Sequence, residues 1–333
     1  MALLRAGIVG YGAMGRQHAR VLSDLEGVEL VGVVDSDEPS TPDGVLGSVE
    51  ALINRGIDYC VVAVPTISHE EVGLLLAQAG IHALIEKPLA GSSGGASRLQ
   101  RAFEAHGLVG SVGHVERFNP AFEQARGRIL DGAIGEIVQI AARRQGPRPT
   151  RIVDVGVVMD LATHDIDIAS WITQSPFDSV SAKSRSLPGH CHEDLVSVVG
   201  LLGNGVVTSH LVDWLSPRKE RVTVITGEKG AFVVDSLTAD LTFFAHGSAS
   251  MEWEDMVRTR GETEGDVTHI AIAKREPLRV EHEHFRDAVL GRSSRTVSMA
   301  EGVATVIVAE AILESAQTGE TVVIPSVAGP SDI

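Results

Sequence analysis

The sequence predicts a mixed α/β fold with two domains. Residues 1–120 form a doubly wound parallel sheet, and residues 121–333 form an α+β domain on a large, mostly antiparallel open sheet. Three observations lead to this prediction. A chain of 333 residues exceeds what one compact core usually holds. Apolar strand-like runs alternate with amphipathic segments up to residue 120, which is typical of a parallel sheet covered on both faces. Beyond it, strand-like runs follow one another directly.

The elements of the first domain alternate along the chain. The strand-like runs occupy residues 3–10, 28–35, 58–65, 82–88 and 108–115. The segments with the apolar spacing of amphipathic helices occupy residues 14–25, 69–80 and 96–107. Ligands of an open α/β sheet bind at the carboxyl ends of its strands, so we expect the functional site there.

The second domain begins with a helix over 122–130 and a strand over 136–144, followed by a helix over 154–172. Asn204-Gly205 between two apolar runs predicts a hairpin. A second turn falls within 226–234. The closing helices, which we expect to pack back toward the first domain, cover 281–291 and 298–319.

The composition excludes several classes of partner. With 28 Lys and Arg against 44 Asp and Glu, the formal charge is −16, which disfavours nucleic acid and anionic membranes. Cys60 and Cys191 are too few for a disulfide framework. No apolar run is long enough for a membrane span, and residues 1–12 have the character of a buried strand rather than a signal peptide. We therefore expect a cytoplasmic protein.

A glycine loop over residues 10–15 predicts a dinucleotide site. Gly10 permits a tight turn, Gly12 lets the backbone approach a pyrophosphate, and Gly15 lets the following helix pack closely on the strand. Asp35 ends the second strand, where a carboxylate binds the ribose 2′-hydroxyl and repels a 2′-phosphate. We therefore predict a Rossmann domain that binds NAD in preference to NADP. The other loop residues expected to contact the cofactor are Tyr11, Ala13 and Met14.

The segment "DVGVVMDLATHDID", residues 154–167, contains four acids and a histidine. It could be a solvated helix face, a metal site or acid/base machinery. Asp160 and His164 have helical i, i+4 spacing next to an apolar stripe, so we expect them to border the core. No third ligand occurs at a diagnostic spacing, so we predict no metal.

Lys87 lies in Glu86-Lys87-Pro88 at the end of another strand. There it would face the nicotinamide side of the crevice, although an ordinary surface lysine fits the position equally well. The glycine loop, "VAVPTISHEE", "EKP" and "DLATHDID" occur in an order and at distances that resemble the glucose-fructose oxidoreductase / inositol dehydrogenase / MocA (Gfo/Idh/MocA) family. The resemblance covers essentially the whole chain.

This resemblance implies a sugar oxidoreductase whose site lies between the two domains, and an open sheet that mediates assembly into a homodimer or homotetramer. Lys87 matches the motif lysine, Asp160 the motif aspartate, and His164 the histidine proposed as general acid/base. A histidine suits removal of a hydroxyl proton, the lysine can stabilise the alkoxide, and the aspartate can orient them. The motifs also place among the cofactor contacts Pro65, Thr66, His69, Glu86 and Lys87.

A basic cluster precedes the helix over 154–172, and no acid occurs between residues 137 and 153. It suggests an anionic substrate group such as a diphosphate, although ion pairs with the excess acids explain it equally well on charge alone. Polar residues at the domain junction suit either sugar hydroxyls or a structural hinge. The substrate contacts that we predict from these two segments are Glu116, Arg117, Asn119, Arg143, Arg144 and Arg151.

Three functions remain open. Residues 113–122 and 151–168 are similar to the branch of the family that includes UDP-N-acetylglucosamine 3-dehydrogenases, which favours oxidation at C3 of a UDP-activated amino sugar. The second possibility is a dehydrogenase of a free polyol or sugar such as myo-inositol. The third is a non-catalytic, NAD-dependent regulatory protein, against which the intact Lys87, Asp160 and His164 argue.

Overall fold

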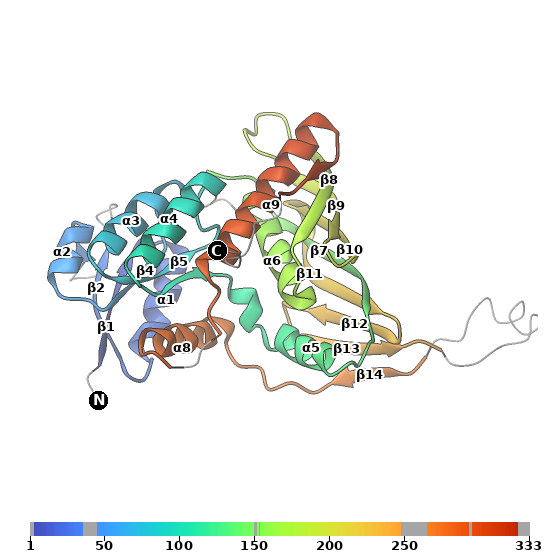
Figure 1. Ribbon diagram of the computed structural model, residues 1–333, viewed down its shortest axis with the longest axis horizontal. Helices are drawn as coiled ribbons and strands as arrows, with labels where there is room; N and C mark the ends of the chain where they lie inside the picture. Colours follow the sequence, from blue (N-terminus) through green and yellow to red (C-terminus); the bar gives the residue numbers. More distant parts are fainter. Residues whose placement is uncertain are drawn as a thin grey trace, which may run out of the picture.

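The computed structural model describes residues 3–35, 45–149, 152, 154–247, 265–292 and 295–325. Two β-sheets lie side by side, with helices between them and around the first (Figure 1). In the described part of the chain, no helix is long and apolar enough to cross a membrane.

The first sheet has six parallel strands in the order β3-β2-β1-β4-β5-β6, as in a dinucleotide-binding doubly wound sheet. Its strands are β1 (Leu4–Val9), β2 (Val28–Val34), β3 (Val45–Leu46), β4 (Tyr59–Val62), β5 (His82–Glu86) and β6 (Gly110–Gly113). The central strands β4 and β5 are almost wholly buried, as expected for a sheet covered on both faces. The predicted doubly wound sheet is therefore confirmed.

Helices connect these strands. They are α1 (Ala13–Ser23), α2 (Val49–Asn54), η1 (Thr66–Ser68), α3 (His69–Gln78), α4 (Ser93–Ala105) and η2 (Val115–Phe118). Ser48 and Ser92 cap α2 and α4, because their side chains accept hydrogen bonds from the Ala51 and Gly95 amides. Helix α1 begins directly at the glycine loop, which directs its amino terminus toward the carboxyl edge of the sheet.

The second sheet has nine strands in the order β14-β13-β12-β11-β7-β10-β9-β8-β15. They are β7 (Ile137–Pro147), β8 (Phe177–Arg185), β9 (Leu195–Leu202), β10 (Val207–Asp213), β11 (Leu215–Gly227), β12 (Gly230–Asp235), β13 (Asp240–Ala245), β14 (Val267–Ile270) and β15 (Val322–Val323). All neighbours are antiparallel except β7 and β10, which confirms the predicted mostly antiparallel sheet. Gly205, with φ of 86°, makes the predicted turn between β9 and β10.

The helices of the second half gather on the face of this sheet that looks toward the first (Figure 1). They are α5 (Pro120–Leu130), the π-helical turn η3 (Val158–Ala162), α6 (Thr163–Thr173) and α9 (Met299–Thr318). Helix α8 (Pro277–Val289) instead returns to the first sheet, where the Phe285 ring meets Tyr59 edge to face at 5.3 Å. On the opposite face of the second sheet, the side chains of Val199, Leu201 and Val207 are exposed.

Candidate active site

A cavity of about 1210 Å³ lies at the carboxyl edge of the first sheet, between that sheet and the second. The loops after β1, β2, β4 and β5 line one end, and η3, α6, β7 and β11 line the other. The order of the first sheet reverses between β1 and β4, which is where such sheets bind ligands. The fold therefore brings the glycine loop and the segment around His164 to one cavity.

The glycine loop has the shape that a pyrophosphate requires. Gly10 has φ of 96°, and a Cβ there would lie 2.4 Å from the Ala63 carbonyl oxygen. A Cβ on Gly15 would lie 1.9 Å from the Gly10 oxygen, so only glycine lets α1 approach β1 this closely. A Cβ on Gly12 would meet nothing within 4 Å. The backbone at Gly12 is thus open toward the cavity, as expected where a phosphate approaches.

Asp35 follows β2 and lines the same end of the cavity, where a cofactor ribose would lie. Its carboxylate accepts a hydrogen bond from the Tyr11 amide, which ties the second strand to the glycine loop. Ala13 and Met14 also line the cavity. The Tyr11 ring instead lies under the Arg16 guanidinium, 5.6 Å from its centroid, and is not part of the lining.

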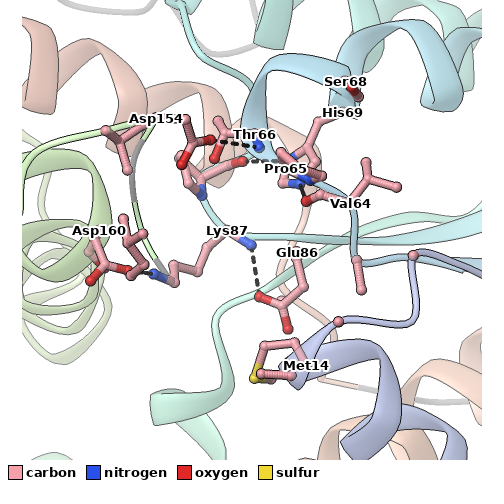
Figure 2. A pocket seen from close by; sticks show the side chains of 18 of the residues that line it. Met14, Val64, Pro65, Thr66, Ser68, His69, Glu86, Lys87, Asp154 and Asp160 are labelled. Atoms are coloured by element: carbon pink, nitrogen blue, oxygen red, sulfur yellow. Dashed lines mark hydrogen bonds and ion pairs between the residues drawn. The ribbon is translucent and has the colours of Figure 1, made fainter. Parts of the chain in front are cut away.

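The loops after β4 and β5 form the next part of the wall. Pro65, Thr66 and His69 line the cavity, and the His69 ring nitrogens lie 2.8 Å from the Pro88 oxygen and 3.0 Å from the Val64 oxygen. His69 therefore holds the two loops together. The Thr66 amide donates to Asp154 Oδ2 at 3.2 Å, which links this wall to the segment before η3 (Figure 2).

Glu86 is buried at the end of β5, behind Lys87. One carboxylate oxygen lies 2.9 Å from His18 Nε2, the other accepts from the Lys87 amide, and His18 Nδ1 lies 2.8 Å from His282 Nε2. Burial acts to raise the pKa of Glu86, but the hydrogen bond with His18 and the positive charges of its surroundings, including Lys87, outweigh it, so the pKa is below its ordinary value. A charged, fixed Glu86 thus positions the backbone of Lys87.

Lys87 points across the cavity to Asp160 (Figure 2). Its Nζ donates to Asp160 Oδ1 at 2.8 Å and to the Asp160 backbone oxygen at 2.5 Å. Lys87 comes from the first sheet and Asp160 from η3, 73 positions later, so folding joins the two motifs in one ion pair. Asp160 is 7% exposed, which confirms that it borders the core.

His164 lies in the first turn of α6 and lines the cavity with Lys87 and Asp160. Burial, reinforced by the positive charges of Lys87 and Arg144, holds its pKa well below the ordinary value. The ring is therefore neutral near pH 7 and able to accept a proton. In the described part of the chain, no three His, Cys, Asp or Glu side chains gather as they would around a metal ion.

The arginines predicted to bind substrate lie elsewhere or are already paired. Arg144 is buried, with Nε 2.7 Å from Asp165 Oδ1 and Nη1 2.8 Å from Glu116 Oε1. Arg143 is exposed and pairs with Glu220 at 2.8 Å. Neither residue lines the cavity. Arg151 lies outside the described residues.

The junction residues are also engaged in internal contacts. Arg117 forms a two-bond ion pair with Asp167, at 2.8 and 2.6 Å, and contacts Glu301 at 2.6 Å. Asn119 caps α5 through the Ala121 amide. Glu116 and Asn119 line a separate, smaller cavity of about 340 Å³. These contacts favour the structural-hinge alternative for this segment.

Three residues that the sequence did not single out line the main cavity from the side of the second sheet. They are Trp214, Lys219 and Arg221. Trp214 lies between β10 and β11, and Lys219 and Arg221 belong to β11. Sequence alone could not select them. The basic residues of "PRKER" stand next to an acid and belong to no recognised motif. Two of them face the site only because β11 pairs with β7.

Fold and site together define a dinucleotide-dependent oxidoreductase: a glycine loop and the carboxylate of Asp35 lie at one end of the cavity, and a lysine, an aspartate and a neutral histidine lie at the other. The chain belongs to the Gfo/Idh/MocA family of NAD-binding oxidoreductases. Residues 4–114 match the model described as the oxidoreductase family with an NAD-binding Rossmann fold, and residues 122–233 match the GFO/IDH/MocA C-terminal domain.

Named relatives act on sugars and cyclitols. The chain is 27% identical over 297 residues to the UDP-N-acetylglucosamine 3-dehydrogenase of Acidithiobacillus ferrooxidans, covering 87% of this chain and 90% of that one. It is 26% identical over 362 residues to inositol 2-dehydrogenase 2 of Saccharopolyspora erythraea, covering 96% and 94%. The crystal structure of GenD2 from gentamicin A biosynthesis in complex with NAD superimposes with a TM-score of 0.82 at 25% identity, covering 98% and 97%.

Proposed function

We propose that the protein oxidises a secondary alcohol of a sugar with NAD, and that C3 of a UDP-activated amino sugar is the first position to test. The observation that carries this proposal is the ion pair between Lys87 and Asp160, at 2.8 Å, in one cavity with the neutral His164 and the glycine loop. Alcohol oxidation needs a base for the hydroxyl proton next to a bound hydride acceptor, and these residues are suited to it.

The residues divide the work as follows. When bound, NAD supplies the nicotinamide that accepts the hydride. His164 takes the hydroxyl proton, because its ring is neutral near pH 7. Lys87 donates a hydrogen bond to the same oxygen and stabilises the charge that develops on it. Asp160 acts through Lys87, since its carboxylate and backbone oxygens fix the position of Nζ.

Two substrate classes have support. The UDP-N-acetylglucosamine 3-dehydrogenase, matched over most of both chains, supports a nucleotide-activated sugar. The inositol 2-dehydrogenase, matched over 96% of this chain, supports a free polyol such as myo-inositol as the second candidate. The cavity of about 1210 Å³ has room for a substrate beside a dinucleotide.

The test is NADH formation by the purified protein with UDP-N-acetylglucosamine, other UDP-sugars, myo-inositol and glucose in parallel. We expect turnover with a UDP-sugar. Turnover with a free polyol alone would replace the first substrate class by the second. NAD binding without hydride transfer from any of these substrates would contradict the proposed activity and favour a regulatory protein.

We further propose that the protein is a homodimer or homotetramer assembled through the outer face of the second sheet. Exposed apolar side chains on β9, β10, β13 and β14 support this, namely Val199, Leu201, Val207, Phe244 and Val267. Light scattering after size-exclusion chromatography tests it. Val207→Lys should shift the mass toward the monomer, and a monomeric unmodified protein would contradict the proposal.

A further inference from the structure

The end of the cavity formed by the second sheet contains hydrogen-bond donors without acceptors. Arg221 Nη1 and Trp214 Nε1 are buried there, and neither has a hydrogen-bond partner among the described residues. Lys219, an exposed residue of β11, also lines the cavity. A guanidinium, an indole and an ammonium can only donate hydrogen bonds. These side chains therefore favour a ligand that is rich in acceptor oxygens.

Arg221 also makes no direct ion pair with any acid in the described part of the chain, although the charges of Asp165, Glu116 and Asp160 act on it from a distance. The neighbouring acids pair with other cations, because Asp160 binds Lys87, and Asp165 and Glu116 bind Arg144. Asp165 does so through Oδ1, and its Oδ2 has no hydrogen-bond partner among the described residues. Burial, followed by the charge of Arg144, lowers the pKa of Arg221 from its ordinary value, and the more distant charges of the three acids only partly offset this.

The position of Arg221 in the sheet is unfavourable for stability. Arg221 on β11 lies directly opposite Arg144 on β7. Like charges in directly opposite positions destabilise a sheet, and leaving a buried donor unpaired adds to this. In a chain of formal charge −16, an unpaired arginine beside a second arginine is not explained by packing. Such a locally unfavourable residue is typical of a binding site.

We infer that Arg221, with Trp214 and Lys219, forms the subsite that binds an oxyanion of the substrate, in place of Arg143 and Arg144. The inference rests on the proposed oxidoreductase function and narrows its substrate to a sugar that carries a phosphate or a carboxylate. A planar guanidinium pairs with either group through two parallel hydrogen bonds. The oxyanion is the diphosphate of a nucleotide-sugar or the carboxylate of a sugar acid, whereas a neutral polyol leaves these donors unpaired.

The subsite lies close to the reacting groups. Arg221 shares the cavity wall with Asp160 and His164, and its charge is among those that act on the His164 ring. An oxyanion held by Arg221 therefore fixes the sugar ring relative to Lys87 and His164. This arrangement contributes to substrate selection and orientation, and proton transfer stays with His164.

The test compares Arg221→Met with the unmodified protein, and Arg218→Met serves as the matched control. Arg218 is an exposed arginine on the same strand that does not line the cavity. Binding of each probe to the protein–NAD complex is measured by titration calorimetry, and turnover by NADH formation. The probes are UDP-N-acetylglucosamine and glucuronate as anions, and N-acetylglucosamine and myo-inositol as neutral compounds.

We expect the unmodified protein to prefer one of the two anionic probes, and which one it prefers separates a diphosphate from a carboxylate. Arg221→Met should weaken the binding of that probe roughly 30- to 1,000-fold, and the effect on turnover should appear mainly in KM. The affinities for the neutral probes should stay within about threefold. Arg218→Met should leave all four unchanged. Arg221→Met should also melt at the same temperature or higher, because it removes a like charge next to Arg144.

Three results would overturn the inference: no binding of either anion to the unmodified protein, an equal or tighter affinity for the neutral probes, or unchanged anion affinity in Arg221→Met. The inference and the proposed activity can fail separately. Anion binding that depends on Arg221 without any NADH would uphold the subsite and contradict the activity. Turnover restricted to a neutral polyol would uphold the oxidoreductase activity and contradict the subsite.

Discussion

The two ends of the cavity are built in different ways. At the cofactor end, the lining comes from loops that directly follow parallel strands, and the glycine geometry lies within six consecutive residues. At the substrate end, side chains meet from segments far apart in the sequence, among them Asp160 on η3, Trp214 after β10 and Arg221 on β11. The first kind of site is local in sequence, and the second depends on strand pairing.

The arginines of the second sheet show the same contrast. Arg144 and Arg221 are cross-strand neighbours, yet Arg144 is held by two acids and Arg221 by none in the described part of the chain. One is therefore part of the core, and the other is available to a ligand. Charge in the sequence does not distinguish them, and the position of the counter-ions does.

Lys87→Met should have the largest effect, because Lys87 joins the two ends. We expect kcat to fall about 10³- to 10⁴-fold, since the donor to the reacting oxygen is lost. NAD affinity should stay within about threefold, because the glycine loop and Asp35 are untouched. Steady-state kinetics and NAD titration measure the two quantities. Normal turnover in this variant would refute the role of Lys87.

Arg144→Met tests the structural side of the comparison. Removing this buried guanidinium leaves the carboxylates of Asp165 and Glu116 without their partner. We therefore expect the free energy of unfolding to fall by about 3–5 kcal/mol. Chemical denaturation measures this. Arg143→Met is the control, because its exposed pair with Glu220 contributes little. An equal loss in both variants would contradict the contrast between buried and exposed arginines.

Much of the fold followed from the sequence, because its signals are local. The alternation of strands and helices, the glycine loop and the Asn204-Gly205 turn each depend on neighbouring residues, and the structure has all three. The apolar stripe of the helix over 154–172 is buried as predicted, although residues 154–156 are not helical and the turn over Val158–Ala162 is π-helical rather than α-helical. That detail depends on contacts that the stripe does not encode.

The substrate end could not be predicted in the same way. An acid-free basic segment drew attention to Arg143 and Arg144, but their partners come from elsewhere: Glu220 from β11, Glu116 from η2 and Asp165 from α6. Arg221 has the same chemistry and lacks these partners. Counter-ions are assigned by tertiary contacts, so a sequence with 28 basic residues does not reveal which of them remain unpaired.

His164→Asn tests the base at the substrate end through the pH profile. Because burial holds the pKa of His164 well below its ordinary value of 6.5, the base stays neutral near pH 7 and is protonated only as the pH falls through that lowered pKa. We expect kcat/KM to be level near pH 7 and to decline only below about 6.5. In the variant, kcat/KM near pH 7 should fall about 10²- to 10³-fold. The decline of kcat/KM at acidic pH should also disappear. An unchanged profile in His164→Asn would assign the base to another group.

Asp35→Ala tests the cofactor end and should have the smallest effect. Loss of a charge-assisted hydrogen bond to the ribose should raise the KM for NAD about 10- to 100-fold and leave kcat at saturating NAD unchanged. Asp35 also accepts from the Tyr11 amide, so the variant could weaken the glycine loop itself. The two effects separate in the NAD-to-NADP ratio of kcat/KM, with the exposed Glu26→Ala on the loop before β2 as control. If Asp35 recognises the ribose, the preference for NAD falls in Asp35→Ala, because the repulsion of a 2′-phosphate is lost. If Asp35 only supports the glycine loop, the variant binds both cofactors more weakly to the same extent and the ratio is unchanged.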